Sequence, residues 1–83
     1  MPEFYTTVEN QVRSDGSYGL LYDHYYGEGA YDRALAKFFT VCAAAAVSDI
    51  PYHSCHIIRS DGVMTEGRVW DRRQPVTTEE ETE

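Results

Sequence analysis

The sequence lacks the long apolar stretch that a membrane-spanning segment requires. Its longest apolar run, from Val41 to Val47, is far shorter than the roughly 20 residues that a transmembrane helix needs. The N-terminal residues show neither the basic region nor the apolar stretch of a signal peptide. We therefore expect no membrane partner and a cytoplasmic location.

Cysteine is also scarce, since Cys42 and Cys55 are the only two in 83 residues. Small secreted domains carry a disulfide framework, whereas two scattered thiols fit a reducing, intracellular setting. A reactive thiolate needs a helix N-terminus or an electropositive pocket. Neither cysteine has such a place in the sequence, so both are expected to be small core residues.

Metal-binding motifs are missing as well. His53, Cys55 and His56 are of zinc-ligand types, but no CxxC or HxxxH spacing occurs. On a strand, His53 and Cys55 point one way and His56 the other. We expect no catalytic residue, no bound metal and no cofactor. The alternative is a small metal-binding or enzymatic domain that uses these three residues.

Basic residues are few, with 7 Lys and Arg against 14 Asp and Glu, a net charge of −7. The final five residues hold four of the acids, which leaves ten acids and seven bases over residues 1–78, a net charge of −3. Binding of phosphate needs a basic surface, so nucleic acid is not expected as a direct partner. An acidic inhibitor that occupies a nucleic-acid-binding surface of a partner protein is a second alternative.

The segments that are present predict a hairpin, a helix and a second hairpin. Residues 4–13, 18–26, 52–59 and 63–72 are rich in β-branched and aromatic types and predict strands. The helix begins at Ala30 or Tyr31 and ends before Pro51, which forbids continuation. The prediction is one α+β domain over residues 1–73, of order ββαββ. Its four-stranded antiparallel sheet has one helix packed on one face, and a disordered acidic tail follows over residues 74–83.

Both hairpins turn on the same residues, Arg-Ser-Asp-Gly. A three-residue loop with glycine at positive φ fits this turn. In the first hairpin that loop pairs Val12 with Tyr18 and Phe4 with Tyr26. It makes a core face of Phe4, Thr6, Val8 and Val12, and leaves Tyr5, Glu9, Gln11 and Arg13 in solvent. In the second hairpin it pairs Tyr52 with Trp70, Ser54 with Arg68, His56 with Glu66 and Ile58 with Met64.

One helix covers only one face of such a sheet, so the other face is a candidate site. We expect the smaller residues Cys55, Ile57, Gly67 and Val69 beneath the helix. The outward set then predicts a ligand- or partner-binding cluster of Tyr52, His56, Glu66, Arg68 and Trp70. The alternative is that the faces are exchanged and Tyr52 and Trp70 belong to the core.

Two features of the helix add to these candidates. Gly27-Glu28-Gly29 precedes the helix, and an anion could meet free N–H groups there with Arg33 nearby. Ala43 to Ala46 leave the end of the helix without a polar residue on any face, which indicates burial by a second subunit. The predicted oligomer interface is Val41, Ala43, Ala44, Val47, Ile58 and Met64.

In overall format the chain resembles small phage-encoded anti-defence proteins. The resemblance is carried by the bare Ala43–Ala46 helix end, the strand face with Tyr52 and Trp70, and the acidic Glu79–Glu83 tail. Some such proteins bind a host defence protein, and others sequester a nucleotide signal in an oligomer. The resemblance implies a viral, non-enzymatic binding protein in the host cytoplasm that acts through self-association. It would sequester a small, nucleotide-like ligand or block a host defence protein.

Overall fold

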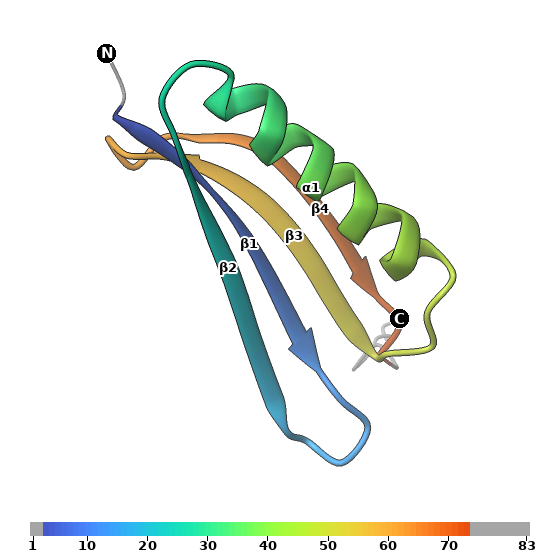
Figure 1. Cartoon of the computed structure of the whole chain (residues 1–83). Helices are drawn as coiled ribbons and strands as arrows, with labels where there is room; N and C mark the ends of the chain where they lie inside the picture. The colour runs from blue at the N-terminus through green and yellow to red at the C-terminus, as the bar shows by residue number, and fades with distance from the viewer. Residues whose placement is uncertain (1–2, 74–83) are drawn as a thin grey trace, which may run out of the picture.

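The computed structural model describes residues 3–73, which form a four-stranded antiparallel sheet with one helix packed on it (Figure 1). The elements in chain order are β1 (Phe4–Val12), β2 (Tyr18–Tyr26), α1 (Ala30–Ala46), β3 (Tyr52–Arg59) and β4 (Met64–Asp71). The strands lie side by side in the order β2-β1-β3-β4. The predicted ββαββ, α+β fold is confirmed, and the predicted acidic tail over residues 74–83 lies outside the described residues.

The first hairpin has the predicted register. Val12 lies opposite Tyr18, and Phe4 lies opposite Tyr26. Gly16 takes a φ of 86° and its N–H donates to the Arg13 carbonyl at 2.9 Å. The Asp15 carboxylate accepts a hydrogen bond from the Ser17 N–H, which stabilises the turn. The turn chemistry of Ser14-Asp15-Gly16 therefore fixes which residues of β1 and β2 meet.

The second hairpin departs from the predicted register at a β-bulge. Ile58 lies opposite Met64 as predicted, but Ile57 lies opposite Glu66, which leaves Thr65 without a partner in β3. One extra residue in a strand turns every later side chain to the other face. Tyr52 therefore lies opposite Asp71, and Trp70 lies opposite His53. The predicted pairs of Tyr52, Ser54 and His56 are wrong for this reason.

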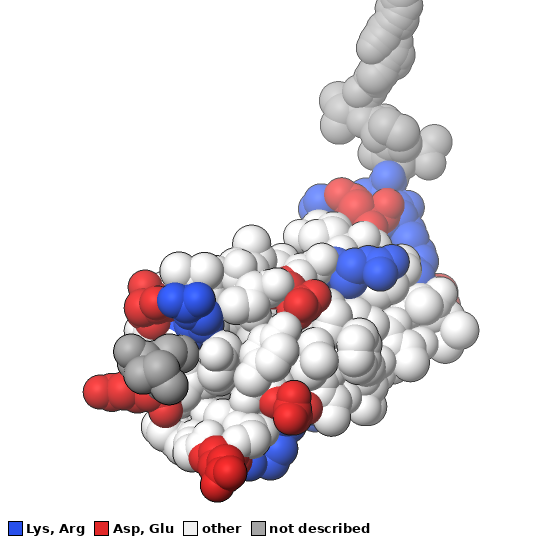
Figure 2. All heavy atoms as spheres, turned by 90° about the horizontal axis from the view of Figure 1, so that it is seen from above, with Lys and Arg blue, Asp and Glu red and all other residues white. Residues whose placement is uncertain are grey.

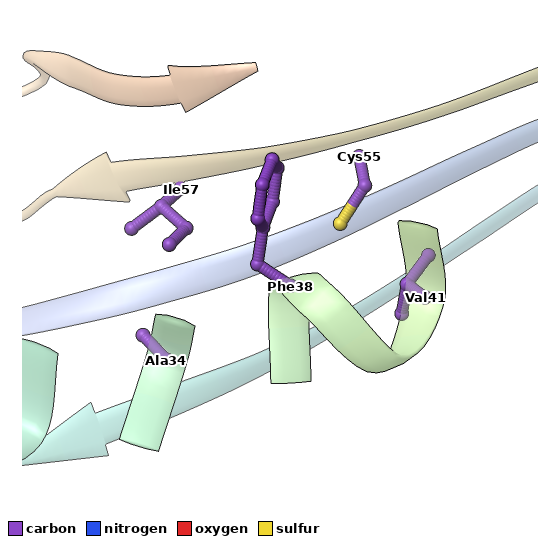
Figure 3. Packing of buried hydrophobic residues seen from close by; sticks show 5 residues of the cluster. All are labelled: Ala34, Phe38, Val41, Cys55 and Ile57. Carbon is purple, nitrogen blue, oxygen red and sulfur yellow. The ribbon is translucent and has the colours of Figure 1, made fainter. Parts of the chain in front are cut away.

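The core lies between α1 and one face of the sheet, here called the covered face. Ala34, Phe38 and Val41 of α1 pack against Cys55 and Ile57 of β3. The Phe38 ring points from α1 toward the sheet, between Cys55 and Ile57 (Figure 3). The prediction that the helix covers Cys55 and Ile57 is therefore confirmed. The same prediction was wrong for Gly67 and Val69, because the bulge places them on the opposite face.

In β1 the two faces are exchanged relative to the prediction. Thr7 and Glu9 pair with Ile57 and Cys55, so they share the covered face with them. The Thr7 hydroxyl donates to the Ala34 carbonyl at 2.9 Å, and the Tyr5 ring lies 5.0 Å from that of Tyr31. The expected core residues Phe4, Thr6, Val8 and Val12 face away from the helix. Pairing of β1 with β3 decides this, and the alternation within β1 carried no information about it.

Two arginines fix the ends of the helix. Arg33 donates to the carbonyls of Tyr26 and Glu28 in the loop that leads into α1. Arg72 follows β4 and donates to the carbonyls of Ala45 and Ala46 at the C-terminal end of α1, at 2.7 and 3.4 Å. A cation beside the last helical carbonyls opposes the negative end of the helix dipole. The helix is thus tied to the strands before and after it.

The buried position of Cys55 leads to a test of the fold. Cys55 has no exposed surface, and its burial raises the pKa of the thiol to about 12. The thiol therefore stays protonated and shielded at pH 8, so we expect iodoacetamide to leave it unmodified in the native protein. Cys42 is only partly buried and should react first. Peptide mass mapping after alkylation, with and without guanidinium, measures both rates; fast native labelling of Cys55 would contradict the assignment of the covered face.

Candidate protein-interaction surface

The face of the sheet turned away from α1 is here called the open face. Its residues follow from the strand pairings, because residues directly opposite each other in antiparallel strands share a face. They come from all four strands. They are Phe4, Thr6, Val8, Asn10, Val12, Tyr18, Leu20, Tyr22, His24, Tyr26, Tyr52, Ser54, His56, Ile58, Met64, Gly67, Val69 and Asp71.

Large apolar and aromatic side chains of the open face are exposed. Tyr18 exposes 63% of its surface, Tyr22 59% and Met64 58%. Leu20, Tyr26 and Val69 are also exposed, whereas the small residues Thr6 and Ser54 lie buried between their larger neighbours. Monomeric proteins rarely expose a continuous apolar patch of more than a few hundred Å² without a binding role. The open face is therefore the leading candidate for a functional surface.

Charge is nearly absent from the open face. Among its strand residues Asp71 alone is charged, and the carboxylate is paired with the guanidinium of Arg73 at 2.8 Å. Hydrogen bonds from Arg73 lower the pKa of Asp71 to about 2, so the pair stays ionised and cancels. The same guanidinium lies 4.7 Å above the Tyr52 ring. Net charge on this face is therefore zero, and the one ion pair sits at the end of β4.

Elsewhere on the surface, charges of both signs are mixed. Figure 2 shows acidic and basic side chains interleaved among uncharged ones on the side seen there, without a large patch of either sign. A surface of this kind lacks the continuous basic patch that binding of a phosphate backbone requires. Nor does the side seen in Figure 2 show the dense acidic face that a mimic of nucleic acid would present.

Contacts within the open face hold its aromatic side chains in place. His24 lies between Phe4 and Tyr22, with ring centroids 5.3 and 5.4 Å away, and Phe4 also meets Tyr26 at 5.1 Å. The hydroxyl of Tyr18 donates to the amide oxygen of Asn10 on the neighbouring strand. Such contacts reduce the side-chain entropy that is lost when a surface is covered.

The predicted binding cluster is divided between the two faces. Tyr52, His56, Ile58 and Met64 lie on the open face as expected, but Glu66, Arg68 and Trp70 lie on the covered face. The Tyr31 hydroxyl of α1 donates to the Glu66 carboxylate at 2.9 Å, and the Arg68 guanidinium lies 5.3 Å from the Trp70 ring centre. The β-bulge thus removes both charged members and the tryptophan from the predicted site.

Two further predicted roles change in the structure. The Arg33 guanidinium donates hydrogen bonds to the carbonyls of Tyr26 and Glu28. Arg33 therefore supports the loop before α1 and is not a free anion ligand. Val41 is 6% exposed and belongs to the core, so its prediction as an oligomer contact is wrong. Ala43, Ala44 and Val47 are exposed as that prediction requires, and Val47 exposes 87% of its surface.

Sequence reasoning missed the main part of the open face, which is the first hairpin. The predicted register pairs Tyr18, Leu20, Tyr22 and Tyr26 with the face of β1 that was expected to be the core, so it places them in the core as well. A signal was available in the pair Leu20-Leu21, which puts a leucine on each face of the same strand. One helix cannot cover both, and the structure exposes both.

Polar groups on the covered face form a small network. Glu9 accepts hydrogen bonds from the imidazole of His53 at 2.5 Å and from the amide of Gln11 at 3.0 Å. A groove of about 200 Å³ next to Glu9 is also lined by Asp23 and Lys37, whose charged groups are 3.7 Å apart. Both side chains of this pair are largely exposed, so solvent screens their interaction.

His53, Cys55 and His56 do not converge. His53 and Cys55 lie buried on the covered face, and His56 lies on the open face. Within residues 3–73, no group of three His, Cys, Asp or Glu side chains is placed to hold a metal ion. The alternative of a metal or enzymatic site at these three residues gains no support from their arrangement.

The network around Glu9 gives a prediction about stability. Replacing Glu9 with alanine leaves the buried imidazole of His53 and the amide of Gln11 without their acceptor. Unpaired buried polar groups cost about 1–3 kcal/mol each, so we expect Glu9→Ala to lower the free energy of unfolding by about that amount in urea titrations. Glu28→Ala, in an exposed loop, is the matched control, and equal losses in both variants would contradict a structural role for the network.

None of the helices in residues 3–73 is long and apolar enough to span a membrane. In comparisons with known proteins, no family model, no curated protein and no solved structure matches this chain.

Proposed function

We propose that this protein is a non-enzymatic binding protein that acts as a self-associated form, in which the open faces of two copies pack against each other. The observation that supports it most is an uncharged sheet face with six large, exposed apolar and aromatic side chains. Two sheets packed face to face would make a β-sandwich with an interior about 10 Å thick.

The size of the open face suits such a dimer. Strands of eight or nine residues rise about 3.3 Å per residue and lie about 4.8 Å apart, so the face measures roughly 19 by 28 Å, or about 500 Å² in projection. A specific interface of standard size buries about 800 Å² on each partner. Protruding rings give the face a larger accessible area than its projection. It is therefore close to what a stable dimer needs.

The absence of net charge on the open face favours a second copy of the chain over a partner with a charged surface. In a dimer with twofold symmetry the same patch meets itself, so any net charge on it would face a like charge. The open face avoids this cost because its one acidic group is paired with Arg73. The remaining acids and bases of β1 to β4 lie on the covered face or in the turns, where a dimer would leave them in water.

The small core of one copy supports the same proposal. Its buried apolar cluster consists of Ala34, Phe38, Val41, Cys55 and Ile57, while most of the aromatic side chains lie outside it. A chain of this length buries only roughly 60% of its unfolded surface and is marginal by itself. Packing two open faces against each other would bury further apolar surface and so stabilise both copies.

Regarding the biological role, protein binding is better supported than sequestration of a nucleotide-like ligand. Arg33 is engaged by backbone carbonyls, and Arg68 lies on the face opposite to His56 and Tyr52. We therefore extend the proposal to an inhibitor that blocks a host defence protein. Support for that extension comes from the resemblance in format to phage-encoded anti-defence proteins.

Neighbouring leucines of β2 provide a matched test of self-association. Leu20 lies on the open face and Leu21 on the covered face, and both are exposed, by 48% and 63%. Leu20→Glu would bury a carboxylate between two apolar sheets, so we expect its dimer dissociation constant to rise by about 100-fold or more. Leu21→Glu should sediment like the unchanged protein.

Analytical ultracentrifugation over a range of protein concentrations measures these constants, and far-ultraviolet circular dichroism confirms that both variants are folded. A wild-type chain that stays monomeric at every concentration overturns the proposal. Equal dissociation in both variants would place the interface elsewhere.

A further inference from the structure

We infer that protonation of His24 and His56 controls this self-association, so that the dimer forms at neutral pH and comes apart in mild acid. The inference rests on the proposed function. It follows from the placement of both histidines on the open face and from the groups that surround each of them there.

His24 lies on the edge strand β2 within a cluster of aromatic side chains. Its Nδ1 is 2.7 Å from the Thr6 hydroxyl of β1. The centroid of its imidazole lies 5.3 Å from that of Phe4, 5.4 Å from that of Tyr22 and 6.3 Å from that of Tyr26. The rings of Phe4 and Tyr26 are themselves 5.1 Å apart. The titratable groups that face it are the phenols of Tyr22 and Tyr26.

His56 lies on the central strand β3, between Val8 of β1 and Gly67 of β4. A methyl group on Gly67 would be 2.8 Å from the imidazole Cδ2 and 3.4 Å from the Met64 sulfur. The missing side chain at Gly67 therefore lets the ring lie across β4. The groups that face His56 on these strands are thus Val8, Gly67 and Met64, none of which is titratable.

Neither histidine faces a carboxylate on the open face. Its one acid, Asp71, pairs with Arg73 and lies four residues along β4 from Gly67, a distance of about 13 Å at the usual rise of a strand. Glu66 is on the covered face, where it bonds Tyr31. An imidazolium on the open face would therefore have no carboxylate to pair with; besides the Thr6 hydroxyl at His24 it would depend on water, which a second sheet displaces.

The sign of the effect follows from this burial. Packing two open faces removes water from four imidazoles, which favours their neutral form. The dimer then binds fewer protons than two separate copies, so its association constant falls as the pH drops through the range in which histidine is protonated. Asp71 does not contribute to the change, because its pKa of about 2 lies well below that range.

Sedimentation velocity at fixed ionic strength tests the inference between about pH 7.5 and pH 5.5. Four imidazoles lose water together, so we expect the dissociation constant to rise by about 100-fold or more over this interval. In the neutral double variant His24→Gln, His56→Gln the dissociation constant, whatever its value, should be the same at both pH values, and each single variant should lose part of the pH response. Circular dichroism at both pH values confirms that the chain stays folded.

The possible outcomes separate the two proposals. A wild-type dimer with the same dissociation constant at both pH values overturns the control by histidine and leaves self-association standing. A full pH response in the double variant overturns the assignment to His24 and His56. A wild-type chain that is monomeric at pH 7.5 overturns self-association itself, and the inference with it.

Discussion

The pairing of β1 with β3 is the constraint on which the rest of this structure depends. Each hairpin closes on its own turn, and this central ladder joins the two hairpins within the sheet, between residues about 50 positions apart such as Thr7 and Ile57. It places Thr7 and Glu9 on the same face as Ile57 and Cys55. Once the helix packs on Cys55 and Ile57, the covered and open faces of both hairpins are decided.

This dependence explains how much could be predicted from the sequence. Local signals gave the elements, their order and the register of the first hairpin, because Ser14-Asp15-Gly16 specifies its own turn. Local signals could not predict which face of β1 packs beneath the helix. Phe4, Val8 and Val12 look like core residues by their alternation, and the register against β3 that sends them outward depends on contacts between distant parts of the chain.

Errors at the candidate site have a second physical source, which is the unpaired residue Thr65. Alternation along β4 predicts that Glu66, Arg68 and Trp70 share a face with Met64, and the bulge separates them. Ala43, Ala44 and Val47 are exposed, as the predicted oligomer interface requires, and their contact with a second copy stays a prediction. Val41 does not fit that interface, because it points into the core on the same helix.

The seven tyrosines divide along the same line. Tyr18, Tyr22, Tyr26 and Tyr52 belong to the open face, whereas Tyr5, Tyr25 and Tyr31 pack against the core beneath and beside α1. Tyrosine suits both places, because its ring adds apolar area and its hydroxyl tolerates water. The many tyrosines of this small chain are thus divided between the core beneath the helix and the open face, which the helix does not cover.

The bulge at Thr65 also bears on how this surface could change over evolution. If Thr65 instead paired with Ile57, the hairpin would be regular and the rest of β4 would turn over. Glu66, Arg68 and Trp70 would then stand beside His56 and Tyr52, while Gly67 and Val69 would turn toward the helix. Substitutions that favour this regular pairing could therefore convert a neutral, self-matching surface into a charged one that favours a different partner, with the length of the chain unchanged.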